Sequence, residues 1–267
     1  GVFFRPSEWY EEQRVETLTR TSVMKLDAAA KVATLSNKQT VSFERALLAT
    51  GANVRILHVD GAELDGIHYL RTLRNADAIR AELETAQRVA IVGGSFIATE
   101  LAASLTAIGK QCELVMMEQL TLERFFGPRV GGVVQKMLTD HGVSIHGGEE
   151  LDRFEGSDGR VDKVVTKSGL EVECDFVVIG AGVLPDIRLA EQAGIETASG
   201  VLTDPCLETS APGIYAAGDI AEYESVIHGE RVRIEHWDVA FNHGRFAALN
   251  MLGQKQPYDV LPYFWSD

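Results

Sequence analysis

Residues 89–100 read Val-Ala-Ile-Val-Gly-Gly-Ser-Phe-Ile-Ala-Thr-Glu, and the class of the fold follows from them. The first four residues form a short apolar run, typical of a strand buried in a parallel sheet. Gly93 and Gly94 permit a tight turn, and the residues after Ser95 have the composition of a helix. This order predicts an α/β unit in which amides at the start of the helix can hold a pyrophosphate.

An acidic residue strengthens this interpretation. Glu118 stands at the end of the next apolar run, where a carboxylate can accept hydrogen bonds from the two hydroxyls of an adenosine ribose. The motif is degenerate, because Ser95 and Ala98 occupy positions where the fingerprint prefers glycine, so an ordinary strand-to-helix turn remains an alternative. Glu118 favours NAD over NADP because it would repel a 2′-phosphate. Arg124 would soften that repulsion, which leaves NADPH open.

Two segments, residues 21–51 and 149–182, have the same plan. Each contains a charged hairpin followed by an apolar run that ends in glycine, at Gly51 and Gly182. Similarity of this kind indicates a duplicated architecture. The counterpart of the Gly93 turn for the first copy would lie before residue 1, so we infer a fragment of a longer protein with two nucleotide sites. The aromatic run at residues 263–265 agrees, because chain ends are usually polar.

Composition and charge exclude several classes of function. The chain has 267 residues, of which 45% are hydrophobic and 24% charged, as in ordinary folded proteins. Its net charge of −14 argues against nucleic acid as the main partner. No apolar run is long enough to span a membrane. The three cysteines are widely separated, which is typical of a reducing compartment such as the cytoplasm. His236 and His243 would share a helix face, but without acidic or cysteine ligands in register we expect no metal site.

Periodicity and turn signals predict the remaining elements. Ser7 would cap a helix over residues 8–14, and residues 52–70 would form a loop. We expect helices over 75–83, 95–107, 127–140, 187–193 and 235–252, and strands at 46–49, 143–146, 176–179 and 214–217. One helix would pack through Val130, Val133, Val134, Met137 and Leu138. The last helix would have a face marked by Trp237, Ala240, Phe241, Ala248, Met251 and Leu252.

Several motifs together carry a resemblance to a known family. They are Arg5-Pro-Ser-Glu-Trp-Tyr, Leu47-Leu-Ala-Thr-Gly, Tyr69-Leu-Arg-Thr-Leu, Val177-Val-Ile-Gly-Ala-Gly-Val-Leu-Pro, Gly213-Ile-Tyr-Ala-Ala-Gly-Asp, Glu235-His-Trp and Tyr263-Phe-Trp-Ser-Asp. With the glycine turn, they resemble the pyridine nucleotide-dependent flavoprotein oxidoreductases. Within these the chain is most similar to the ferredoxin or rubredoxin reductase branch, which includes apoptosis-inducing factor and its relatives.

The resemblance implies an α/β fold with two Rossmann-like domains for FAD and NAD(P), the FAD domain being split and incomplete. The FAD domain would comprise residues 1–78 and 206–267, and the NAD domain residues 79–205. The FAD pyrophosphate turn would lie upstream of Gly1 and a C-terminal domain downstream of Asp267. We therefore expect this chain to bind FAD poorly or not at all, and its oligomeric state, including a homodimer, stays open.

The resemblance also assigns roles to particular residues. On the FAD side it implies Thr50, Gly51, Arg71, Asp219, His236, Trp237 and Trp265. On the NAD side the motif and the resemblance together indicate Gly93, Gly94, Ser95, Phe96, Ile97, Glu100, Glu118, Arg124 and Gly182. Asp219 would bind the flavin ribityl chain, and the helix after Glu235 would direct its positive end at the flavin ring. Some of these roles have a purely structural alternative: Asp219 would cap a helix, Trp237 would pack in the core, Arg71 would be a solvated side chain and Glu100 would be a charge on the helix surface.

The leading hypothesis is a reductase that passes a hydride from NADH to FAD and electrons onward to a small iron–sulfur protein. No side chain need act as acid or base, because the protein supplies orientation and electrostatic field. The alternative is an NAD-binding redox sensor or interaction protein of the apoptosis-inducing-factor type. Turnover with an added ferredoxin would separate the two hypotheses.

Overall fold

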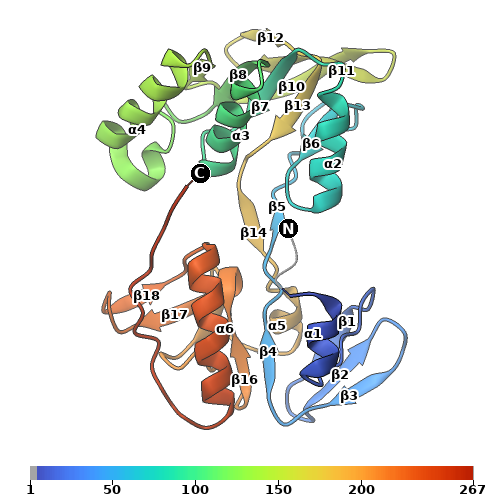
Figure 1. Cartoon of the computed structure of the whole chain (residues 1–267), viewed down its shortest axis with the longest axis vertical. Helices are drawn as coiled ribbons and strands as arrows, with labels where there is room; N and C mark the ends of the chain where they lie inside the picture. The colour runs from blue at the N-terminus through green and yellow to red at the C-terminus, as the bar shows by residue number, and fades with distance from the viewer. Residues whose placement is uncertain (1–4, 267) are drawn as a thin grey trace. The chain divides into compact units, whose positions relative to one another are not determined.

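The computed structural model describes residues 5–266, which divide into two compact units (Figure 1). Within this range, unit 1 contains residues 5–51 and 185–264, and unit 2 contains residues 52–184 and 265–266. Unit 2 is thus inserted into unit 1. Each unit has its own hydrophobic clusters and is described by itself.

The observed boundaries differ from those expected at residues 78 and 205. Residues 52–78 belong to unit 2 because strand β6 (Ile67–Tyr69) pairs with that unit's central sheet. Residues 185–205 belong to unit 1 because α5 (Arg188–Gln192) and β15 (Val201–Thr203) contribute to its core. Both boundaries of the inserted compact unit therefore lie earlier in the chain than the expected domain boundaries.

Unit 2 is built on a parallel five-stranded sheet with the order β6-β13-β7-β8-β9. Its other strands are β7 (Arg88–Val92), β8 (Gln111–Met116), β9 (Ser144–Gly147) and β13 (Phe176–Ile179). The connecting helices are α2 (Leu73–Glu82), α3 (Phe96–Ala107) and α4 (Glu123–Asp140). The strand order runs outward from β7 through β8 to β9 and then returns to β13 on the other side of β7. The carboxyl ends of β7 and β13 therefore form the topological switch point, where open α/β sheets bind ligands.

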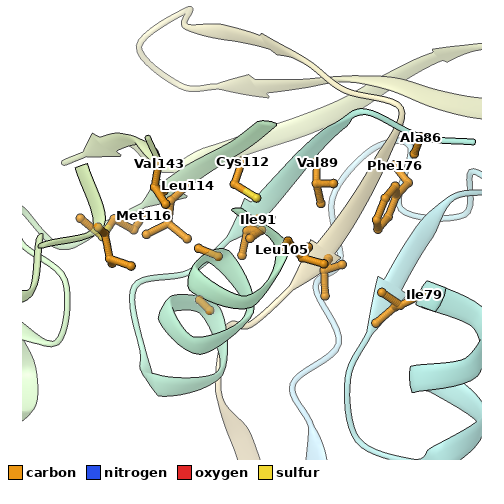
Figure 2. Close-up of a cluster of buried hydrophobic side chains, with 14 residues drawn as sticks. Ile79, Ala86, Val89, Ile91, Leu105, Cys112, Leu114, Met116, Val143 and Phe176 are labelled. Atoms are coloured by element: carbon orange, nitrogen blue, oxygen red, sulfur yellow. The ribbon is translucent and has the colours of Figure 1, made fainter. Parts of the chain in front are cut away.

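Both faces of this sheet are covered, and the strand sequences show why. In β7, Val89 and Ile91 face the helices, whereas Ala90 and Val92 face a three-stranded antiparallel sheet. That sheet consists of β10 (Leu151–Ser157), β11 (Arg160–Thr166) and β12 (Glu171–Glu173). Figure 2 shows the helix-side cluster, in which Val89 and Ile91 lie near Leu105 of α3. Apolar residues at consecutive strand positions are required because neither face meets water.

Unit 1 contains a parallel pair and two small sheets. β4 (Ala46–Leu48) pairs with β16 (Ile214–Ala216). β1 (Val23–Asp27), β2 (Val32–Leu35) and β3 (Thr40–Ser42) form one antiparallel sheet. β15, β17 (Ala221–Ser225) and β18 (Glu230–Val232) form a mixed sheet, in which β15 is parallel and β18 antiparallel to β17. The unit also contains α1 (Ser7–Glu12), the short 3-10 helix η1 (Gly218–Ile220) and α6 (Trp237–Met251).

The predicted duplication is confirmed in the described residues. The sheet β1-β2-β3 is followed by β4, and the sheet β10-β11-β12 is followed by β13. Each copy therefore ends in a parallel strand preceded by an antiparallel three-stranded sheet. Gly51 and Gly182, which follow these two copies, both have positive φ angles, of 66° and 87°.

Some predicted elements were wrong. Residues 52–70 are not all loop, because they contain β5 (Ala52–Val54), which pairs with β14 (Val183–Pro185), as well as β6. Both strands are too short for periodicity to reveal. Ser7 does not cap α1: the extended Pro6 occupies the cap position, and Ser7 is already helical. α4 starts at Glu123 and not at residue 127, but the non-helical Gly127 (φ 73°, ψ 175°) interrupts it, so the predicted helix over 127–140 matches the segment after this kink.

The predicted packing faces of two helices were only partly right. On α4, Leu138 is buried and Val134 packs against the core as predicted, whereas Val130, Val133 and Met137 are exposed. On α6, the buried residues are Val239, His243, Phe246, Ala247 and Asn250. Trp237, Phe241 and Leu252 of the predicted face are exposed. Each apolar stripe in the sequence thus coincides only in part with the side that packs on the core; on α6, Met251 is the predicted residue that does so.

Candidate functional site

A cavity of about 460 Å³ opens in unit 2 at the carboxyl ends of β7, β8 and β13. It brings together six of the residues predicted from the sequence: Gly93, Gly94, Ser95, Glu118, Arg124 and Gly182. These residues come from three separate segments of the chain. Parallel strands place their carboxyl ends at one edge of the sheet, so segments distant in sequence converge there.

The glycine turn is required by close packing. Gly93 has φ 128°, a conformation that residues with side chains rarely adopt. A Cβ atom on Gly93 would collide with the carbonyl oxygen of Gly180, and one on Gly94 would lie 2.6 Å from Sδ of Met116. The backbone can therefore lie against the ends of β8 and β13 only if both positions are glycine.

Both departures from the glycine fingerprint contact the same residue, Gly180. Ser95 donates a hydrogen bond from Oγ to the Gly180 carbonyl oxygen at 3.1 Å. Ala98 is fully buried, and its Cβ lies 3.1 Å from the point where a Cβ on Gly180 would stand. A glycine in the strand-to-loop segment thus provides the space that the fingerprint normally obtains from a glycine in the helix.

The amino terminus of α3 adjoins this turn. Ser95 occupies the cap position but makes no side-chain cap, because its hydroxyl is directed to Gly180. The positive end of the helix dipole therefore adjoins the cavity without a side-chain cap, as at anion-binding helix starts.

The other residues predicted on α3 do not line the cavity. The Phe96 ring lies 4.7 Å from the ring of Phe125, and Ile97 is half-buried. The Glu100 carboxylate accepts a hydrogen bond from the Ser266 hydroxyl at 2.6 Å.

Acidic side chains dominate the charge of the cavity. Glu118 follows β8, and its carboxylate lies 3.5 Å from the guanidinium of Arg124. Glu149 accepts hydrogen bonds at 2.6 Å from the hydroxyls of Ser168 and Thr166. These bonds lower the pKa of the Glu149 carboxyl, so it is charged at neutral pH. The carboxylates that line the cavity are those of Glu118, Glu123, Glu149 and Glu150.

Sequence reasoning missed part of the cavity lining. Leu57, His58 and Val59 lie in the segment taken as a loop, and Met117, Leu122 and Phe125 follow β8. Leu122 has a φ of 55°, and its N–H donates to the Gly94 carbonyl oxygen at 2.9 Å. That bond fixes the loop after β8 to the glycine turn. No motif marks these residues, and the only available signal was their position after strand ends.

In unit 1, the parallel pair β4–β16 brings a second group of predicted residues to one edge. Ala216 is in register with Leu48, so Thr50 and Gly51 follow one strand where Gly218 and Asp219 follow the other. The Thr50 hydroxyl donates to the Asp186 carbonyl oxygen at 2.6 Å. Asp219 is half-buried, and its own carbonyl accepts a hydrogen bond from Arg233 at 3.1 Å.

Helix α6 begins beside aromatic side chains. His236 occupies its cap position and accepts a hydrogen bond at Nδ1 from the Asp238 N–H at 3.2 Å. Its ring lies 4.7 Å from that of Phe264. Trp237 stacks on Phe241 with ring centroids 5.4 Å apart, and it is 58% exposed. The alternative of Trp237 as a core residue is therefore wrong.

Arg71 and Trp265, also predicted for the FAD side, belong to unit 2. Arg71 donates from Nε to the Ala52 carbonyl oxygen at 2.7 Å, which positions it beside the start of β5. The alternative interpretation of Arg71 as a solvated side chain is only partly right: the residue is exposed, but the hydrogen bond to the backbone holds its guanidinium. Neither residue lines the unit 2 cavity.

Two further observations concern residues 5–266. Within this range, His, Cys, Asp and Glu side chains form no cluster of three or more that could hold a metal. None of the helices in the same part of the chain combines the length and apolar character needed to cross a bilayer.

The chain was compared with known families and proteins. Residues 6–244 match the family model described as pyridine nucleotide-disulphide oxidoreductase. The chain is 29% identical over its whole length to rubredoxin–NAD(+) reductase from Pseudomonas putida, covering 69% of that protein. It is 33% identical to the ferredoxin–NAD(+) reductase component of the anthranilate 1,2-dioxygenase system from Burkholderia cepacia, with all of this chain aligned to 65% of that one. The chain thus spans about two thirds of the length of these relatives.

Solved structures agree. The ferredoxin reductase for the CYP199A2 system from Rhodopseudomonas palustris superposes with a TM-score of 0.95 at 32% identity, over 99% of this chain and 65% of that one. Putidaredoxin reductase, in its covalent complex with putidaredoxin, gives 0.94 at 31% identity with the same coverage. The predicted α/β fold of Rossmann-like FAD and NAD(P) domains is therefore confirmed.

Proposed function

The chain belongs to the pyridine nucleotide-disulphide oxidoreductase family, in its ferredoxin and rubredoxin reductase branch, and we propose that it carries the dinucleotide sites of an NADH-dependent flavoprotein reductase. The observation that supports this most is the cavity of unit 2. A glycine turn, a helix amino terminus and a carboxylate lie together at the switch point of a parallel sheet. The glycine turn and the helix amino terminus suit a pyrophosphate, and the carboxylate suits the adenosine ribose next to it. The cavity therefore matches the adenosine half of a dinucleotide.

Each part of the cavity has a proposed task. The backbone of Gly93 and Gly94 would approach the pyrophosphate closely, because neither residue has a side chain to hold it away. The start of α3 would stabilise the two phosphate charges through its dipole. Glu118 would accept hydrogen bonds from the adenosine ribose hydroxyls, and Gly182 would line the path toward the nicotinamide. We propose that Phe96, Ile97 and Glu100 border this path without lining the cavity itself.

The charge of the cavity supports NADH over NADPH. Glu118, Glu149 and Glu150 all line it, and Arg124 is the arginine among the lining residues. Because Arg124 lies 3.5 Å from Glu118, its charge is already partly compensated. A 2′-phosphate added to the ribose would meet the Glu118 carboxylate and gain little from Arg124.

Unit 1 fits the ring and ribityl side of a flavin. A Cβ atom on Gly218 would lie 3.3 Å from Cβ of Ala240, so a glycine is needed where the chain turns beneath α6. Asp219 follows at the sheet edge, and Thr50 and Gly51 end the neighbouring strand. We propose that Asp219 accepts hydrogen bonds from ribityl hydroxyls and that His236, Trp237 and the start of α6 border the ring. The flavin roles expected for Arg71 and Trp265 stay predictions, because both residues belong to unit 2. A bound flavin would supply the two-electron to one-electron chemistry.

The electron acceptor is proposed to be a small iron–sulfur protein. The relatives are named for rubredoxin and ferredoxin as partners, and one solved relative is covalently joined to putidaredoxin. In this reaction the chain's own residues bind and orient the donor nucleotide and exclude water, and none of them needs to carry a proton. The alternative redox-sensor function predicts slow turnover with any added ferredoxin.

Equilibrium titration with NADH and NADPH tests the proposed donor site. We expect the wild-type chain to prefer NADH and Glu118→Ala to bind NADH about 10- to 100-fold more weakly, since a charged hydrogen-bond acceptor contributes about 1.5–3 kcal/mol. NADPH binding should change far less, so the gap narrows. Glu150→Ala is the matched control, because Glu150 also lines the cavity but pairs with Lys167. An unchanged coenzyme preference in Glu118→Ala would remove Glu118 from the site.

A further inference from the structure

A buried histidine holds the turn that carries Asp219. His243 of α6 is completely buried, and its Nδ1 accepts a hydrogen bond from the backbone N–H of Gly218 at 3.3 Å. Gly218 has φ 73° and begins η1, and Asp219 is the next residue. The imidazole thus reaches from the helix to the strand-end turn.

The surroundings of the ring keep it in the form that accepts this bond. Tyr223 and Tyr258 contact it edge-to-face, with ring centroids 4.7 Å and 4.5 Å away. Burial lowers the pKa of His243 to about 4, so the imidazole is neutral at physiological pH. A neutral ring that accepts at Nδ1 must carry its proton on Nε2.

Stability alone does not account for this histidine. Nε2 is buried and has no hydrogen-bond partner among the described residues. Without His243, the Gly218 N–H would lose its acceptor, so the side chain replaces one unsatisfied buried N–H group with another. Since either group costs about 1–3 kcal/mol when left unpaired, the exchange brings little net stability. The hydrogen bond from the Gly218 N–H to His243 instead fixes the orientation of the turn at Gly218 and Asp219.

The turn is held from other sides as well. Arg233 donates from Nη1 to the Asp219 carbonyl oxygen at 3.1 Å. Ala240, one turn of α6 before His243, packs against Gly218. Together these contacts restrain the peptide on both sides of the Asp219 side chain, and His243 supplies the restraint on its amino-terminal side.

We propose that His243 is a positioning residue that fixes the Gly218–Asp219 turn so that the Asp219 carboxylate is presented at the sheet edge. The inference rests on the proposed function, in which Asp219 receives the hydroxyls of a flavin. It adds a residue outside the cofactor's contacts on which cofactor binding depends.

Hydrogen exchange on the full chain tests the restraint directly. His243→Gln retains an acceptor oxygen, and His243→Leu retains the volume without an acceptor. Tyr258→Phe removes a neighbouring buried hydroxyl that has no hydrogen-bond partner within residues 5–266. We expect exchange of the Gly218 amide to accelerate about tenfold or more in His243→Leu and to stay slow in His243→Gln and Tyr258→Phe. Amides of Ala216 and Val239 should be unaffected in all three.

Two results would overturn the proposal. One is an unchanged Gly218 amide in His243→Leu. The other is a uniform acceleration across unit 1 in that variant, which would indicate a general structural role instead. Equilibrium titration with FAD, which also measures weak binding, gives the second readout: His243→Leu should bind FAD at least tenfold more weakly than wild type, and His243→Gln should recover most of the affinity. If the wild-type chain binds no FAD at saturating concentrations, the proposed flavin site fails in this chain, and the exchange result still decides whether His243 fixes the turn.

Discussion

Gly180 allows the β7–α3 turn to pack tightly against β13, although this turn lacks two of the glycines of the usual fingerprint. The residue accepts the Ser95 hydrogen bond, faces the Ala98 methyl group and lies against Gly93. These contacts link β13 to the β7–α3 turn, although the residues are far apart in the sequence. The degenerate fingerprint is therefore compatible with tight helix-to-sheet packing because the compensation comes from another strand.

Substituting Gly180 tests this at a single residue. In Gly180→Ala the new methyl would stand 3.1 Å from Cβ of Ala98, in a place where the helix and strand backbones leave little freedom. We expect a loss of about 1–3 kcal/mol in the free energy of unfolding by urea, as for other overpacked cores. Gly132→Ala is the control, because a Cβ there meets nothing within 4 Å, and it should be neutral or slightly stabilising. Equal effects of the two substitutions would contradict the account.

His243 also predicts a pH dependence. Because burial depresses its pKa from 6.5 to about 4, the folded state binds fewer protons than the unfolded state between these values. Stability from this group is present above pH 6.5 and falls as the pH drops toward 4, by up to about 3 kcal/mol. Tyr223 and Tyr258, which face the ring, stay protonated because burial raises their pKa values. Urea unfolding from pH 4 to 7 should give a flatter stability profile for His243→Gln than for wild type; parallel profiles would refute the assignment.

Single residues of the site were predictable only where a motif fixed them. The glycine turn and Glu118 stand at set places relative to a strand, so the sequence located them and the structure brings them into one cavity. His58 and Glu149 have no such marker, because they reach the cavity through tertiary folding. The role of Gly180 could not be predicted either, since it depends on contacts between segments that periodicity treats separately.

Among the elements, α2 begins with a reciprocal cap. The Thr72 hydroxyl accepts a hydrogen bond from the Asn75 N–H at 3.2 Å, and the Asn75 side chain accepts one from the Thr72 N–H at 3.0 Å. The sequence prediction started this helix at Asn75, although the structure starts it at Leu73. The cap explains the earlier start, because it satisfies amides of the first turn.

Removing the cap should therefore destabilise unit 2 measurably. We expect Thr72→Ala to lower the free energy of unfolding by about 1 kcal/mol and Thr72→Ser to restore most of it. Chemical denaturation followed by circular dichroism provides the measurement. A Thr72→Ala variant as stable as wild type would show that the cap contributes nothing to this helix.

The positions of the helices and longer strands in the sequence were predicted better than the faces through which the helices pack. Long periodic segments such as α3 and α6 were found, with ends that differ by about two residues, as expected for boundary assignments. The packing face of α4 was only partly predicted, because Leu138 is buried whereas Val130 and Met137 of the same apolar stripe are exposed. The short β5 and β6 were missed because three residues carry no periodicity and their pairing partners lie far away in the sequence.

At the scale of the whole molecule, the insertion of unit 2 into unit 1 predicts separable folding. A chain of residues 52–184 contains the complete parallel sheet, so it should unfold cooperatively and be stabilised by NADH through mass action. A chain of residues 79–205 lacks β6 and retains α5 and β15 without their core partners. We expect the second chain to melt at a lower temperature and with less cooperativity. Equal melting of the two chains would show that the boundaries lie elsewhere.

The central claim is that the cavity of unit 2 binds the adenine half of NADH. Hydrogen–deuterium exchange of the full chain, with and without saturating NADH, tests it most directly. We predict protection confined to the glycine turn at residues 93–98, the end of β8 at residues 116–118, and residues 180–182. Protection elsewhere with these three segments unchanged, or no protection at an NADH concentration that saturates binding, would contradict the account.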